Sequence, residues 1–193
     1  MARISLEPPR TLLNRLLMPL ARRRFGMVPD PGKAMAHNGR VLVTDLLNET
    51  GVATWKRLDP TLKALAVTAS AARIGCSWCM DFGYWEHTHR GLDPAKLRAV
   101  PQWRDSDLFG PLERRVMEYA EAMSADPMET TDAMVAELLA ELGEAALVEL
   151  TAIVAVENRR SRFNHALGLT SQGFTDTCEV AQAVPHARQE EQA

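Results

Sequence analysis

Cysteine is scarce in this chain: Cys76, Cys79 and Cys178 are its only three thiols in 193 residues. Three cysteines cannot build the dense crosslinks of a small secreted disulfide scaffold, and such scarcity is typical of a reducing compartment. Basic residues are not in excess either, since the formal net charge is −3. The charge therefore gives no reason to expect nucleic acid as a partner, and we expect a cytoplasmic protein.

Long apolar runs and strand patterns are also missing. No apolar run approaches the roughly 20 residues that span a bilayer, and the N-terminus lacks an uninterrupted apolar core with a small-residue cleavage site. We therefore expect neither a membrane span nor secretion. No two-residue alternation flanked by hairpin turns predicts a strand. The apolar content of 46% and charged content of 24% are ordinary for a soluble globular protein.

Most of the sequence shows patterns typical of helices. Asp59 and Pro60 supply a cap followed by a first-turn proline, and Gly75 closes the helix that they start. Further helices are predicted over residues 33–50, 79–90, 93–100, 111–124, 130–142 and 144–169. Residues 147–156 are apolar almost all round, which predicts a buried helix. The fold class is therefore all-α, a helical bundle with a Cys-x-x-Cys pair at the start of a helix.

Three parts of the chain differ in composition: an arm over residues 1–32, a helical domain over 33–175 and a polar tail over 176–193. The arm carries leucines at helical spacing, then three arginines, and we expect Pro19 to interrupt its helix. Two interpretations stay open: a membrane-surface helix, or a leucine face packed on the body or on a neighbouring subunit. The acidic balance of the whole chain favours the second.

The Cys76–Cys79 pair is the strongest functional signal. Two thiols three positions apart in the first turn of a helix approach bonding distance with a modest backbone adjustment. The helix N-terminus stabilises a thiolate, which is the form that attacks peroxides and disulfides. The loop that such a disulfide closes is very short, so its effect on stability is small. The pair is thus expected to be a reversible redox couple.

The stretch L-D-P-x-L-K-x-L-A followed by G-C-x-W-C, with Gly91 twelve residues after Cys79, resembles the carboxymuconolactone decarboxylase and alkylhydroperoxidase D superfamily. PLERRVMEYAEAMSADP and VAVENRRSRFNHALGL are similar to the later part of its longer, peroxidase-related members. The resemblance implies an all-helical fold and assembly into trimers or hexamers. In the redox branch it implies that Cys79 attacks the peroxide and that Cys76 resolves the intermediate.

This sequence departs from the family's redox motif at two positions. The motif relays a proton through a glutamate twelve residues before the first cysteine and a histidine four after the second; here these are Ala64 and Gly83. The nearby groups that remain as candidates are Asp81, Tyr84, Glu86, His87 and His89. His87 lies about 12 Å from Cys79 by helical rise, on the same face. Asp81 is closer, but a carboxylate beside a thiolate raises the thiol pKa.

Other residues have more ordinary interpretations beside a functional one. Cys178 and His186 have the wrong spacing to complete a common zinc module with the cysteine pair, so no metal site is expected. Asn158, Arg162 and His165 lie on one helical face, where a subunit contact is favoured over an anion pocket. Trp78, Phe82 and Trp85 flank the thiols, and a packed core is favoured over a substrate channel.

Three functional hypotheses follow. The first is a thiol oxidoreductase in which Cys79 and Cys76, with His87 and Asp81 as candidate catalytic residues, reduce a hydroperoxide or disulfide at the expense of a thiol or dithiol reductant. It needs no cofactor, and we expect a weak enzyme because Ala64 and Gly83 cannot relay a proton. The second is a non-redox lyase or decarboxylase acting on a small carboxylated substrate. The third is a non-catalytic binding or assembly protein. In each case we expect a homo-oligomer.

Overall fold

The structure, a computed structural model, describes residues 2–174, and over these residues it is helical with no strand. The prediction of an all-α fold is confirmed. The elements are α1 (Leu12–Phe25), α2 (Asp30–Met35), α3 (Gly39–Val52), α4 (Pro60–Ile74), α5 (Ser77–His89), α6 (Pro94–Ala99), a 3-10 helix η1 (Val100–Asp105), α7 (Pro111–Ser124) and α8 (Asp132–Ala166). Cys178, His186 and the predicted tail lie outside the described residues. No helix among residues 2–174 is long and apolar enough to cross a membrane.

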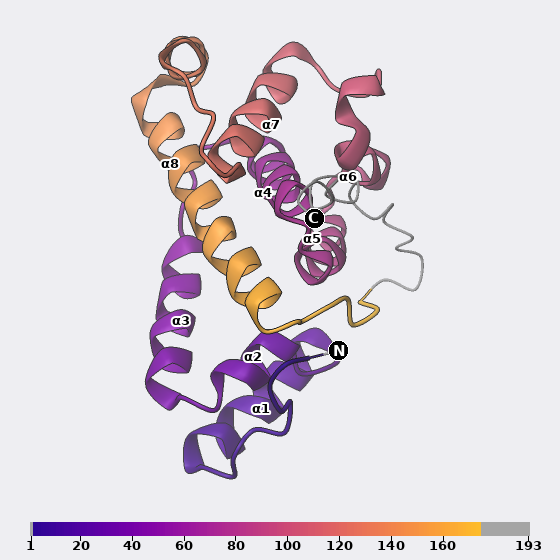
Figure 1. The fold of residues 1–193 in the computed structure, drawn as a ribbon, viewed down its shortest axis with the longest axis vertical. Coiled ribbons are helices and arrows are strands. Elements are labelled where there is room, and N and C mark those ends of the chain that lie inside the picture. The colour runs from indigo at the N-terminus through magenta and orange to yellow at the C-terminus, as the bar shows by residue number, and fades with distance from the viewer. Residues whose placement is uncertain (1, 175–193) are drawn as a thin grey trace, which may run out of the picture.

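Helix α4 is the centre of the core and packs mainly against α7, α8 and α5. α1 and α2 lie at the end of the molecule toward which α8 runs, and α7 lies toward the opposite end (Figure 1). Small side chains on α4 allow its neighbours to approach closely, since Ala64, Ala66 and Ala69 are fully buried. Larger apolar side chains from α7 and α8, among them Met117 and Leu150, complete the core.

The ends of α4 fix the position of the cysteine pair. Asp59 Oδ1 accepts hydrogen bonds from the backbone N–H of Thr61 at 2.8 Å and of Leu62 at 3.1 Å, which satisfies the first turn. At the other end Gly75 takes a left-handed conformation with φ of 81°, which glycine adopts without a steric cost. The predicted helix is confirmed at both ends, and Cys76 follows its terminus directly.

Two local predictions near the N-terminus are wrong. Residues 33–50 do not form one helix: the chain leaves α2 at Met35 and begins α3 at Gly39. Asn38 caps α3 because its Oδ1 accepts from the backbone N–H of Arg40 at 3.2 Å and Val41 at 3.3 Å. Pro19 does not interrupt α1, which continues through it. A proline removes one N–H donor from a helix, and here the helix continues despite that loss.

Helix α8 is kinked at Gly143, where φ is 74° and ψ is 166°. The two helices predicted on either side of this glycine are therefore confirmed, joined at a sharp bend. Burial around residues 147–156 is incomplete, contrary to expectation. Val148 is 68% exposed, and Glu149 forms an ion pair with Lys63 of α4. Leu150 and Val154 are fully buried, so this half of α8 presents one face to α4 and another to solvent.

Candidate functional site

Cys76 and Cys79 are joined by a disulfide at the start of α5, with 5.3 Å between their Cα atoms. Cys76 is the N-cap residue of the helix, and its Sγ accepts a hydrogen bond from the backbone N–H of Cys79 at 3.2 Å. The partial positive charge of the helix N-terminus acts at this position and stabilises a thiolate. The predicted disulfide is present.

Both sulfurs are shielded from solvent. Cys76 is 2% exposed and Cys79 7%, and they pack with Ala71 and Ala72 from the end of α4 and with Trp78. Interactions between charged and polar groups are stronger in such an environment than in water, because little solvent screens them. Polar side chains that reach the sulfurs therefore interact with them more strongly than they would in water.

Two polar side chains of α8 contact the disulfide. Ser161 Oγ lies 3.2 Å from Cys79 Sγ. Asn164 Nδ2 lies 3.3 Å from the same sulfur and 3.7 Å from Cys76 Sγ. Ser161 and Asn164 are almost fully buried, so their side chains are held against the sulfurs by the packing of α8. Neither residue was predicted from the sequence to belong to the site.

Glu157 lies one turn before Ser161 and is linked to it. Its Oε1 is 2.7 Å from Ser161 Oγ, and the residue is 2% exposed. Burial raises the pKa of the Glu157 carboxyl, although the positive charge of Arg160 opposes the shift. Arg160 Nη1 is 3.4 Å from Glu157 Oε2, and the same guanidinium pairs with Glu49 of α3.

His87 is buried near the C-terminal end of α5, two turns beyond Cys79. Its Nε2 has no hydrogen-bond partner among residues 2–174. Desolvation, followed by the positive charges of Arg90 and Arg160, lowers its pKa from 6.5 to about 4. The imidazole is therefore neutral at physiological pH.

The neutral state of His87 makes stability depend on pH. Between pH 6.5 and about 4 the unfolded chain binds a proton at this histidine and the native protein does not. The contribution of His87 to the free energy of unfolding should therefore fall by about 3 kcal/mol as pH drops through that interval, and no further below it. Urea unfolding should show a correspondingly smaller loss in His87→Gln. Equal losses in the two proteins would contradict the burial of a neutral His87.

Asp81 faces a different part of the chain. Its Oδ2 accepts hydrogen bonds from Ser171 Oγ at 2.8 Å and from the backbone N–H groups of Gln172 at 3.0 Å and Phe174 at 3.1 Å. Gln172 Oε1 in turn accepts from Trp78 Nε1 at 2.8 Å. Asp81 thus holds residues 171–174 against α5, and its predicted catalytic role stays a prediction.

The remaining polar candidates on α5 have structural partners. Glu86 pairs with Arg90 at 2.8 Å. His89 Nδ1 is 2.7 Å from the backbone oxygen of Trp85. The Arg98 guanidinium lies 5.1 Å from the centre of the Tyr84 ring, in a cation–π contact.

Aromatic rings form a continuous cluster beside the disulfide. Trp78 stacks on Phe82 with centroids 5.0 Å apart, and Phe174 meets Phe82 edge to face at 5.2 Å. Phe25, at the end of α1, contacts Phe82 at 5.6 Å, and Trp85 completes the cluster. The N-terminal arm and residues 171–174 therefore cover the same aromatic face of α5, which agrees with the predicted packed core.

Asn158, Arg162 and His165 do not converge on a common anion pocket within residues 2–174, and the subunit contact that was favoured for this face stays a prediction. Asn158 Nδ2 donates to Ser124 Oγ at 2.9 Å and Ser70 Oγ at 3.2 Å, while Arg162 and His165 are exposed. Ser161 and Asn164, which contact the disulfide, and Glu157, which contacts Ser161, have the same spacing but lie one position earlier. A shift of one residue rotates a helical face by about 100°. The polar character of positions 157, 161 and 164 within a buried helix was the available signal.

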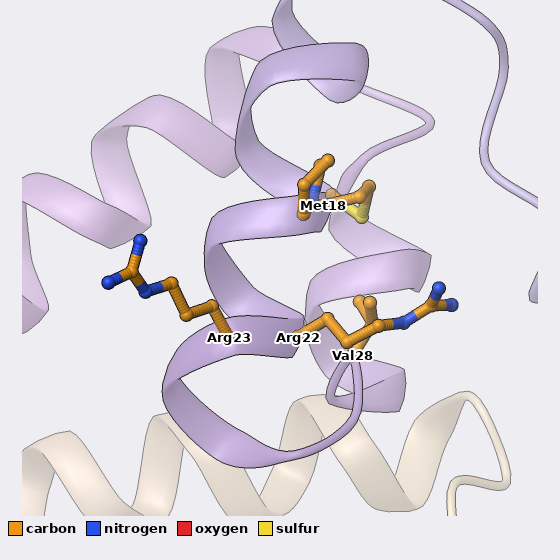
Figure 2. A pocket seen from close by; sticks show the side chains of 5 residues that line it. Met18, Arg22, Arg23 and Val28 are labelled. Atoms are coloured by element: carbon orange, nitrogen blue, oxygen red, sulfur yellow. The ribbon is translucent and has the colours of Figure 1, made fainter.

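A surface pocket on α1 does not extend this site. It is lined by Met18, Pro19, Arg22, Arg23 and Val28. Figure 2 shows Arg22 and Arg23 pointing to opposite sides of the helix. Two guanidinium groups that diverge in this way do not converge on one anion.

Comparison with known proteins places the chain among relatives. Residues 43–122, which include both cysteines of the pair, match the profile of the Carboxymuconolactone decarboxylase family. An uncharacterized protein of Escherichia coli (strain K12), YnjA, is 34% identical over 174 residues, which cover 86% of this chain and 94% of YnjA. The chain belongs to the carboxymuconolactone decarboxylase family.

Solved structures share the fold. The debrominase Bmp8, as a cysteine-to-alanine variant in complex with 2,3,4-tribromopyrrole, superposes with a TM-score of 0.78 at 21% identity, covering 90% of this chain and 95% of that one. A peroxidase-related protein of Silicibacter sp. TM1040 superposes with a TM-score of 0.74 at 16% identity, covering 86% of this chain and 90% of that one. ATU0492 of Agrobacterium tumefaciens, a putative antioxidant defence protein AhpD, superposes with a TM-score of 0.66 at 18% identity, covering 72% of this chain and 94% of that one.

The structure also shows what occupies the two positions of the family's proton relay. Ala64 is fully buried and packs with Tyr84 and Leu97. Gly83 lies in the middle of α5, and a Cβ built there would be 4.0 Å from His87 Cδ2. The side chains at these two positions carry no titratable group. In this member of the carboxymuconolactone decarboxylase family, the titratable group that the hydrogen bonds connect to Cys79 is Glu157 of α8.

Proposed function

We propose that the protein is a thiol-dependent oxidoreductase that reduces a hydroperoxide, or a disulfide, by cycling Cys76 and Cys79 between dithiol and disulfide. The observation that carries this proposal is the disulfide itself, buried at a helix N-terminus and contacted by the side chains of Ser161 and Asn164. Hydrogen bonds to a thiolate stabilise it and lower the thiol pKa.

The reaction with a hydroperoxide balances as follows. The Cys79 thiolate attacks the terminal oxygen, so an S–O bond forms and the O–O bond breaks. The leaving alkoxide takes a proton and becomes an alcohol. Cys76 then attacks the sulfenic acid on Cys79, forming the S–S bond and releasing water. A thiol or dithiol reductant restores both thiols and is itself oxidised to a disulfide.

A stoichiometric experiment tests the proposal. The protein is reduced, freed from reductant and mixed with one equivalent of cumene hydroperoxide. We expect one equivalent of alcohol and a mass loss of two hydrogens, located by peptide mapping to the Cys76–Cys79 segment. Alcohol formation without this disulfide, or no consumption of peroxide, would contradict the proposed cycle.

A lyase acting on a small carboxylated substrate is the second candidate. It is favoured by the family to which the chain belongs and by the loss of the usual relay at Ala64 and Gly83. In that case the cysteines are structural, and a variant with both replaced by serine keeps its activity. The thiol cycle requires the same variant to be inactive.

The resemblance to the Bmp8 fold adds one class to be assayed, the brominated aromatic rings. Reductive removal of bromide would consume the same two thiols: the ring carbon gains hydrogen, bromide leaves and the disulfide forms. Bromide release by the reduced protein distinguishes this substrate class from hydroperoxides.

We expect the protein to assemble into a homo-oligomer. Leu12, Leu16 and Leu20 follow one another on one face of α1 and are 83%, 65% and 55% exposed, so this face has no partner within the described chain. Light scattering should give a molar mass that is a multiple of 21.4 kDa. Leu16→Glu should lower this mass because it places a charge on the apolar face, whereas Arg23→Glu, a change at an already polar site, should leave it unchanged. A monomeric wild type at micromolar concentration would contradict assembly.

A further inference from the structure

Glu157, Ser161 and Cys79 form a continuous chain of hydrogen bonds that ends at the Cys79 sulfur. Glu157 Oε1 is 2.7 Å from Ser161 Oγ, and Ser161 Oγ is 3.2 Å from Cys79 Sγ. Glu157 and Ser161 are one helical turn apart on α8, and both are almost fully buried. Buried side chains on a packed helix keep these distances without reorganisation, which is a requirement for rapid proton transfer.

The serine hydroxyl has a single hydrogen and two neighbours that can accept it. When Cys79 is a thiol, the S–H can point to Ser161 Oγ while the serine donates to the Glu157 carboxylate. When Cys79 is a thiolate, the serine donates to the sulfur and accepts from a protonated Glu157. These arrangements differ only in the positions of two protons.

We propose that Glu157 and Ser161 form a proton relay on α8 that takes the proton of Cys79 and replaces the relay missing at positions 64 and 83. The inference rests on the proposed thiol chemistry. In this relay Ser161 touches the reacting sulfur and is a catalytic residue, whereas Glu157 acts through Ser161 and is a positioning residue.

The relay accounts for every proton of the peroxide reaction. The Cys79 proton passes to Ser161 Oγ as the serine proton passes to Glu157, which leaves a thiolate and a neutral carboxyl. After the thiolate has broken the O–O bond, the stored proton returns through Ser161 to the alkoxide. Glu157 is then a carboxylate again, and Cys76 supplies the second proton to the water that leaves when the disulfide closes.

The environment of Glu157 suits a group that accepts a proton and releases it again. Burial raises the pKa of the Glu157 carboxyl, while the positive charge of Arg160 limits this rise. Glu49 of α3, which also pairs with Arg160, is a further charged group that acts on Glu157. His87 of α5 lies within the influence of Arg160 and is neutral above about pH 4. The titratable group that the hydrogen bonds connect to Cys79, through Ser161, is therefore Glu157.

The test measures Cys79 directly, without a peroxide. In a Cys76→Ser/Cys178→Ser background only Cys79 is alkylated, and serine keeps the N-cap hydrogen bond. Two coupled acids share their titrations, so the alkylation rate should rise with pH in two steps in this background. Adding Glu157→Gln or Ser161→Ala should leave a single alkaline step. Ser161→Thr, which keeps the hydroxyl, should restore both steps.

Glu149→Gln is the matched control, since Glu149 is also buried on α8 but pairs with Lys63. This variant should keep both steps of the alkylation rate even where its thermal midpoint falls.

With both cysteines of the pair present, Glu157→Gln should slow oxidation by cumene hydroperoxide about 10²-fold at neutral pH. A single step in the Cys79-only background, or two steps after Glu157→Gln, would overturn the relay. Two steps in a protein whose dithiol form does not react with peroxide would support the relay and overturn only the peroxidase activity.

Discussion

Replacement of Cys79 by serine should abolish dithiol-dependent reduction of cumene hydroperoxide, with a fall of roughly 10³-fold or more in the rate constant. A serine hydroxyl at this position is not ionised at neutral pH and cannot form the sulfenic acid. The fold should persist, because the short loop that the disulfide closes adds little stability. Peroxide consumption measured under reductant excess, with circular dichroism on the same samples, provides the check.

Cys76→Ser is the matched control for this result because the two cysteines have different roles in the cycle. Without the resolving thiol, Cys79 should still consume close to one equivalent of peroxide and then stop as a sulfenic acid, which dimedone labels. A single fast turnover in Cys76→Ser beside none in Cys79→Ser identifies the attacking sulfur. The reverse pattern would show that Cys76 is the attacking cysteine and Cys79 the resolving one. Equal activity in the two variants would contradict the thiol mechanism.

Ala64→Glu should destabilise the protein by roughly 3 kcal/mol or more. Ala64 is fully buried and packs with Tyr84 and Leu97, so a longer side chain overpacks the helix contact and places a carboxyl group where no water reaches it. Urea unfolding at neutral pH should show the loss as a lower midpoint. A variant as stable as the wild type would mean that α4 and α5 separate more easily than their packing indicates.

Gly83→Ala is the corresponding control at the other relay position. A Cβ at Gly83 makes only ordinary contact, at 4.0 Å, with His87 Cδ2, and alanine is favoured over glycine in a helix by about 1 kcal/mol. This variant should therefore unfold at the same or a higher urea concentration. The double variant Ala64→Glu/Gly83→His is then expected to be destabilised by the change at position 64 and not to gain activity.

The sequence was sufficient to predict the features that depend on local chemistry. Asp59, Pro60 and Gly75 carry their own start and stop signals, and the structure confirms the helix between them. The disulfide between Cys76 and Cys79 follows from their spacing in a helical first turn. Asn38 also carries a capping signal, but the apolar periodicity on both sides of it concealed the break between α2 and α3.

The polar half of the site depends on helical phase, which the sequence did not determine. Residues 147–156 are apolar almost all round, so the hydrophobic pattern does not define which face of α8 turns inward. Asn158 and Asn164 are both polar, and only the packing of α8 against α4 and α5 determines which of the two side chains reaches the sulfurs. The sequence drew attention to Asn158, Arg162 and His165, which lie one residue out of phase with the residues Glu157, Ser161 and Asn164 on the disulfide side of α8.

The contact between α5 and α8 also has an evolutionary consequence. The family-wide segment, residues 43–122, contains both thiols but none of the α8 side chains that meet them. The two parts of the site are encoded far apart and share one chemical constraint. A chimera that takes this segment from one relative and its α8 from another would inherit a thiol pair without the matching hydroxyl and carboxyl groups. The residues at positions 64 and 83 are therefore best compared among relatives together with those at positions 157 and 161.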